Sequence, residues 1–163
     1  MYGDIAGANL WKNPDASTLE VVLKNASKKK ITIDGNWCSL SIDSTKAKNA
    51  LKVHTEVEFK EMLINYFGDE SLLKTYTNAV NLKFTNVDIV AKNSTTTEKY
   101  LAYGIIYLDT KPGTNNLKLE KTNITVEDGY NRLITKTVAV IRVNQSGTGA
   151  KTLNIEMKNS SFD

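Results

Sequence analysis

The chain has 163 residues, 40% of them hydrophobic, which is enough for one domain with a continuous core. Its 21 Lys and Arg residues against 18 Asp and Glu give a net charge of +3, and the positive charge is spread along the chain. Only Arg132 and Arg142 are arginines, so the composition argues against nucleic-acid binding, which needs a clustered basic surface and bidentate arginine contacts.

The N-terminal segment, MYGDIAGANLW, lacks the charged and apolar regions of a secretory signal peptide. No stretch reaches the roughly 18 apolar residues that cross a bilayer, so we expect no membrane insertion. Either the protein is cytoplasmic, or it is secreted and its signal and anchor belong to a longer precursor. Cys38 is the only cysteine, which argues against an internal disulfide or a multi-cysteine metal site and favours a role as core filler. We expect neither a metal nor a cofactor.

Two capping-box patterns, at 17–20 and 55–58, predict helices in the N-terminal half. Each pairs a Ser or Thr hydroxyl with a glutamate three residues later, as at helix starts. The apolar residues of 55–68 fall mostly on one helical face, and a second short helix is expected over 69–76. Each helical region leads into a strand. We therefore predict that residues 1–80 form a helix-containing cap and the first coils.

Three similar segments follow in the C-terminal half. Leu82 and Leu117, the second residues of the first two segments, are 35 residues apart, and Leu117 and Leu153 are 36 apart. A second segment, YGIIYLD from Tyr103, matches VAVIRVN from Val138 with an offset of 35. Two strand patterns that repeat together indicate a repeat architecture. The three segments are NLKFTNVDIVA from Asn81, NLKLEKTNITV from Asn116 and TLNIEMKNSSF from Thr152.

Within each copy the apolar residues alternate with polar ones, as in a β-strand with one buried face. The alternation breaks near Thr85, Lys121 and Lys158, with an asparagine close by that tolerates the left-handed backbone of a corner. The expected fold class is mainly β, a parallel β-helix (solenoid) with about 35 residues per repeat. Residues 81–163 would form its regular coils within a single domain, 1–163. A leucine-rich repeat and a β-sandwich are the alternatives.

The 35-residue match also predicts a surface feature. It places Tyr107 beside Arg142, and Ile105 beside Val140, on the outer face of adjacent strands. A tyrosine beside an arginine can stack a sugar ring or bind a carboxylate, although such pairs also serve as ordinary cross-strand contacts. Three further tyrosines are expected at the edge of this face. The candidate ligand-binding residues are Tyr100, Tyr103, Tyr107, Tyr130 and Arg142.

The segments STLEVVLKNASKKKITIDGNW, NLKFTNVDIV and YGIIYL together resemble the pectate lyase-like adhesive domain of Gram-positive bacterial surface proteins. The resemblance extends over residues 17–147. It implies a right-handed β-helix and an extracellular adhesin or wall-associated module at the cell surface. It supplies no catalytic residues.

The leading hypothesis is therefore a non-catalytic module that presents an elongated face to a host or cell-wall glycan or protein. Two alternatives stay open: a polysaccharide lyase or hydrolase, or its inactive relative, and a structural subunit that stacks end to end through its C-terminal coil. Such enzymes need paired or clustered carboxylates, whereas the acidic residues here are scattered singly. The sole histidine, His54, stands beside an expected helix start.

Overall fold

A computed structural model describes residues 21–23, 30–43, 49–68, 71–76, 80–92, 104–127 and 139–163. These residues form twelve β-strands and, within the same ranges, no helix. The prediction of a mainly β protein is thus confirmed. Every strand pair within these ranges is parallel.

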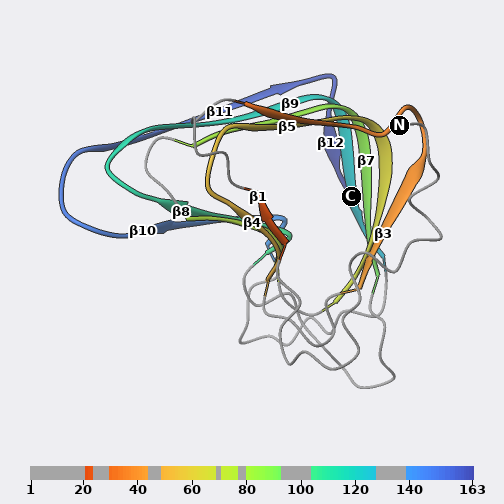
Figure 1. Ribbon diagram of the computed structural model, residues 1–163, viewed down its shortest axis with the longest axis horizontal. Helices are drawn as coiled ribbons and strands as arrows, with labels where there is room; N and C mark the ends of the chain where they lie inside the picture. Colours follow the sequence, from red (N-terminus) through yellow and green to blue (C-terminus); the bar gives the residue numbers. More distant parts are fainter. Residues whose placement is uncertain are drawn as a thin grey trace.

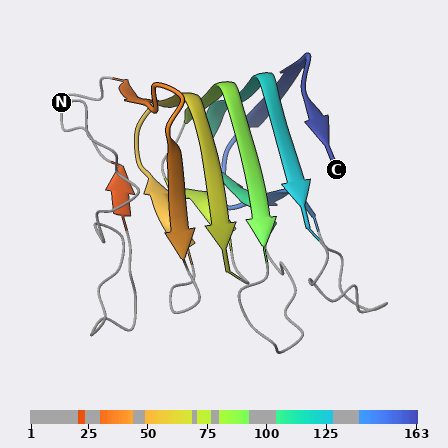
Figure 2. The same ribbon diagram turned by 90° about the vertical axis from the view of Figure 1, so that its right-hand side faces the viewer.

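The strands belong to two sheets, and the chain alternates between them (Figure 1). Sheet A has the order β1-β4-β6-β8-β10; sheet B has the order β11-β9-β7-β5-β2, with β3 beside β5 and β12 beside β9. We call each pass through both sheets a rung; the rungs run from β1–β3 at one end to β10–β12 at the other (Figure 2). Sheet A comprises β1 (Val21–Leu23), β4 (Asn49–Val53), β6 (Ser71–Thr75), β8 (Ile106–Thr110) and β10 (Ile141–Gln145). Sheet B comprises β2 (Ile31–Asp34), β3 (Ser39–Asp43), β5 (Val57–Phe67), β7 (Asn81–Lys92), β9 (Gly113–Val126), β11 (Lys151–Lys158) and β12 (Ser161–Phe162).

Apolar side chains from successive rungs align in rows and fill the space between the sheets. Phe59, Phe84 and Leu119 form one row of sheet B, and each is 1% exposed. The rings of Phe59 and Phe84 stack with their centroids 5.1 Å apart. Sheet A contributes Leu73 and Ile106, which are in register and also buried. The predicted alternation is therefore confirmed for the first two copies of the repeat.

Sheet B bends sharply where the alternation breaks (Figure 1). Glu61, Asn86, Lys121 and Asn159 adopt left-handed backbone there, with φ between 48° and 53°. A residue in this conformation shifts the alternation by one position at the bend. The alternating side chains before and after the bend therefore both face the core. The predicted corners are confirmed. Asparagine occupies only two of them; Glu61 and Lys121 adopt a conformation that disfavours ordinary L-residues by about 1–2 kcal/mol.

The helices predicted over 55–68 and 69–76 are wrong, because these residues form β5 and β6. The alternation of buried residues in β5 changes phase at Glu61, which has the left-handed backbone. That change of phase puts apolar residues three and four positions apart and so imitates an amphipathic helix. The N-terminal half of the chain is therefore not a helical cap where the structure describes it. The capping box at 17–20 lies outside the described residues.

The repeat length varies more than the sequence suggested. Leu82 pairs with Leu117 at the predicted 35 residues, but Val57 pairs with Leu82 at only 25. In the last rung Ile155, not Leu153, pairs with Leu117, which makes the spacing 38. A repeat of about 35 residues throughout is therefore wrong. Strand pairing fixes only which residues face the core, so the connections between sheets can differ in length from rung to rung.

Candidate functional site

The outer face of sheet A carries a row of three cations and one tyrosine. Strand register aligns Lys52 of β4, Lys74 of β6, Tyr107 of β8 and Arg142 of β10. Their neighbours in the same strands are mostly core residues, and successive side chains in a strand point to opposite faces. These four residues, hereafter the cationic row, therefore lie together on the outside of the sheet.

Aromatic rings hold the two lysines of the cationic row. The Lys74 Nζ lies 4.6 Å from the ring centroid of Tyr107 and 5.0 Å from that of Tyr76. The Lys52 Nζ lies 5.3 Å from the Tyr76 ring, which in turn stacks on His54 with centroids 5.2 Å apart. Each cation–π contact at a surface contributes about 0.5–1 kcal/mol. The rings thus restrict two ammonium groups that would otherwise sample many rotamers.

A carboxylate beside the cationic row is already engaged. Asp109 accepts a hydrogen bond from Nδ2 of Asn144 at 3.0 Å and lies 3.2 Å from Nζ of Lys111. Burial acts to raise the pKa of Asp109, but neighbouring groups, including Asn144 and Lys111, outweigh it and hold the pKa below its ordinary value. Asp109 is therefore ionised at neutral pH, and a lowered pKa does not suit a general acid there.

The structure confirms that Tyr107 and Arg142 are neighbours, as the 35-residue match predicts. Tyr107 is only 9% exposed, so its ring is not open to stack on a sugar; it supports Lys74 instead. Ile105 is fully buried, and its predicted place on the outer face is wrong because the chain bends just before β8 begins. The candidate residues Tyr100, Tyr103 and Tyr130 lie outside the described residues.

Sequence reasoning missed Lys52, Lys74 and Tyr76. The segment that contains two of them was predicted to be helical, and Leu73 pairs with Ile106 across 33 residues, outside the 35-residue match. A local signal was present. The tetrapeptides LKVH from Leu51 and LKTY from Leu73 share an apolar, lysine, small and aromatic pattern, and they occupy equivalent positions in adjacent strands.

The outer face of sheet B carries charges that pair with one another. Glu58 lies 2.7 Å from Lys30 and 3.1 Å from Lys83, and Lys118 lies 2.8 Å from Glu156. Part of this face, around Lys83, Lys118 and Glu156, is a shallow depression of about 250 Å³. Lysines and carboxylates therefore alternate on this face, and their charges offset one another.

The contacts of Glu58 with two lysines lead us to predict that the stability of the protein depends on pH. Hydrogen bonds from Lys30 and then Lys83 hold the pKa of Glu58 below its ordinary value of 4.5. The stabilisation is therefore complete above that value and is lost as the pH falls through the lower, folded-state pKa. We expect Glu58→Gln to lose about 1 kcal/mol of unfolding free energy at neutral pH, and the difference from wild type to shrink in acid.

Urea titrations of both proteins from neutral to acidic pH measure this difference. Glu120→Gln is the control, because the Glu120 carboxylate lies 4.0 Å from Lys158. Its loss should be smaller than that of Glu58→Gln. A Glu58→Gln loss that is equal at all pH values would contradict the ionic role of Glu58.

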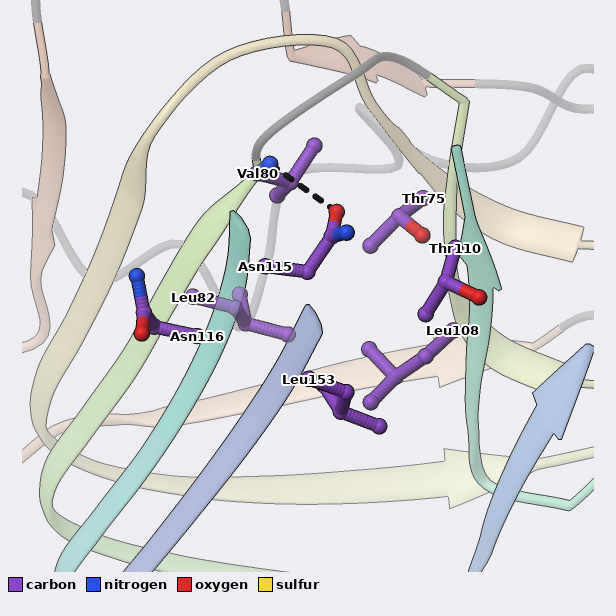
Figure 3. A pocket seen from close by; sticks show the side chains of 8 residues that line it. All are labelled: Thr75, Val80, Leu82, Leu108, Thr110, Asn115, Asn116 and Leu153. Carbon is purple, nitrogen blue, oxygen red and sulfur yellow. Dashed lines mark hydrogen bonds between the residues drawn. The ribbon is translucent and has the colours of Figure 1, made fainter. Parts of the chain in front are cut away.

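A small internal cavity lies between the sheets (Figure 3). Polar side chains of Thr75, Thr110 and Asn115 line it together with apolar residues such as Leu108 and Leu153. Its volume of about 10 Å³ leaves room for one water molecule at most. The cavity is therefore not a site for an organic ligand.

Within the described ranges, no three His, Cys, Asp or Glu side chains gather as a metal site would require. Cys38 is exposed, so its expected role as core filler is wrong. No helix in the part of the chain that the structure describes could cross a membrane. Comparisons of the chain with protein-family models, curated proteins and solved structures find no significant match.

Proposed function

We propose that the chain is a right-handed parallel β-helix in which sheets A and B are walls of stacked coils. The parallel register and the alternation between the sheets support this fold. Connections between parallel strands of one sheet are right-handed in about 98% of cases. The sequence resemblance to the pectate lyase-like adhesive domains of Gram-positive surface proteins agrees with it.

On that fold we infer a non-catalytic, extracellular binding module of a bacterial surface, whose cationic row binds an acidic glycan. The observation that carries this inference is the placement of Lys52 and Lys74 against tyrosine rings, in one row with the exposed Arg142. Neighbouring strands lie about 4.8 Å apart, close to the size of one sugar unit. Carboxylates along an extended chain can therefore meet Lys52 and Lys74 on neighbouring strands and Arg142 two strands beyond Lys74, and arginine binds a carboxylate bidentately.

Arg142→Glu tests the proposal, with Lys118→Glu as its matched control. Both residues are exposed, lie in strands on an outer face and change the charge by the same amount, but Lys118 belongs to sheet B. Isothermal titration calorimetry with polygalacturonate, and with neutral dextran for comparison, measures binding. We expect Arg142→Glu to weaken polygalacturonate binding at least tenfold, which corresponds to about 1.4 kcal/mol, and Lys118→Glu to change it less than twofold.

Equal binding of the acidic and neutral polymers, or equal losses in the two variants, would overturn the assignment of the ligand site. Release of unsaturated or reducing ends from polygalacturonate would overturn the non-catalytic assignment in favour of a lyase or hydrolase.

A further inference from the structure

The last rung exposes apolar side chains at core positions. Ile155, Met157 and Phe162 are 47%, 43% and 41% exposed. They are in register with Leu117, Leu119 and Ile124 of the preceding rung, which are buried. On sheet A, Val143 of β10 is likewise 43% exposed. Within the described residues, β10 and β11 pair on one side only. This end of the molecule therefore presents both an open strand edge and an apolar surface.

The first rung presents a matching edge at the opposite end of the molecule (Figure 2). Among the described residues, strands β1 and β2 end the two sheets there, and they run in the same direction as β10 and β11 because all these pairs are parallel. Leu23, Ile31 and Ile33 of this edge are only partly buried. Leu40 and Ile42 of β3 are already buried, so within the described residues the partly exposed apolar side chains of this edge belong to β1 and β2.

Polar residues of the two edges are complementary when the existing register is continued. Ile31 aligns through the intervening rungs with Ile155. If the stack continued in this register, β2 of a second copy would lie against β11 of the first. Lys158 of one copy would then face Asp34 of the next. In this same row within the chain, Asp34 already binds the lysine of the neighbouring rung, Lys60, at 2.6 Å. The opposite charges at the two ends therefore continue a pattern that the molecule already uses.

The side-chain amides extend the same match. Nδ2 of Asn154 donates to Oδ1 of Asn116 at 2.8 Å, and Asn116 in turn donates to Asn81. Continuing the register places Lys30 of the next copy beside Asn154, whose Oδ1 can accept from the Lys30 ammonium. Glu156 would face Thr32, whose hydroxyl can donate to a carboxylate. All three outer rows of sheet B thus meet a compatible partner at the junction.

Head-to-tail contact also fits the shape of a rung better than a two-fold contact. A parallel junction continues both sheets at once, since β10 meets β1 while β11 meets β2. In a two-fold contact of the last rung with itself, β11 would run antiparallel to its copy. The sides of the rung in sheets A and B differ in length, and this contact would also reverse their order. Only part of the edge could then pair.

We propose that a second copy of this chain docks its β1–β2 edge, in parallel register, on the β10–β11 edge of the first. This contact is heterologous and leaves an open edge at each end of the pair, so assembly continues without closing. The proposal does not depend on the glycan-binding role of sheet A.

Analytical ultracentrifugation over a wide range of concentrations tests the proposal. The weight-average mass of the wild-type chain should grow past that of a dimer without a plateau. Ile155→Lys places a charge in the apolar junction and should keep the mass at the monomer value. Leu63→Lys is the matched control, because Leu63 is 36% exposed in β5, away from either edge; it should assemble like wild type. Circular dichroism confirms that both variants fold.

A mixing experiment separates this contact from other forms of association. Ile155→Lys keeps an intact β1–β2 edge, so it should join wild-type assemblies and terminate them, and an equimolar mixture should show a lower mass than wild type at the same wild-type concentration. A wild-type monomer at every concentration, a mass that stops at the dimer, or equal effects of the two substitutions would each overturn the proposal.

Discussion

Phe84→Ala should lower the free energy of unfolding by about 3–5 kcal/mol, the usual range for truncation of a buried phenylalanine. Phe84 is 1% exposed and lies in the middle of a row, with Phe59 in one neighbouring rung and Leu119 in the other. Its ring stacks on Phe59, with the planes inclined by 10°. Truncation would therefore open a cavity between two rungs, and the paired strands on both sides limit how far it can collapse.

Urea denaturation followed by circular dichroism measures this loss. Lys83→Ala is the control, since Lys83 is adjacent in the chain, points outward and lies 3.1 Å from Glu58. Its loss should stay below about 1 kcal/mol, as for other surface ion pairs. Similar losses in the two variants would contradict the assignment of inner and outer faces.

The main features of the β structure were predictable because they depend on local alternation. The segments from Asn81 and Asn116 show the two-residue period clearly, and their 35-residue offset is the register of β7 against β9. The corners were predictable at Asn86 and Asn159, where the residue type suits the left-handed backbone. Where glutamate takes that conformation, at Glu61, the same corner went unrecognised and the strand was predicted to be a helix.

The spacing of the other rungs could not be predicted for a different reason. Parallel pairing requires only that core-facing residues align, and connections between sheets can lengthen without disturbing it. The third copy of the repeat shows the consequence. Leu153 resembles Leu117 in its local sequence, but the chain advances two more residues before β11 comes into register, and Ile155 takes that place.

The candidate site was predictable only in part. The neighbouring positions of Tyr107 and Arg142 followed from one repeat, whereas Lys74 came from a rung with a different spacing. The register of the strands does not determine how exposed each of these side chains is. A residue on an outer face can still be covered, as Tyr107 is beneath Lys74, and the rings therefore hold cations in place of stacking on a ligand.

Asn115→Leu should lower the free energy of unfolding by about 2 kcal/mol, because a near-isosteric apolar side chain would leave buried backbone groups without partners. Asn115 is 6% exposed and points between the sheets (Figure 3). Its Oδ1 accepts from the N–H of Val80 at 3.2 Å, and its Nδ2 donates to the carbonyl oxygens of Lys111 at 3.2 Å and of Thr152 at 3.5 Å. One amide thus joins the backbone of three successive rungs.

Asn116→Leu is the matched control, because it makes the same chemical change at the next residue, which faces outward. Asn116 bonds the amides of Asn81 and Asn154, and at the surface water can replace these partners. Its loss should stay below about 1 kcal/mol. Chemical denaturation of both variants measures the difference. Equal losses would mean that the buried amide is no more important than the outer one, and that the connections between the sheets are held by strand pairing alone.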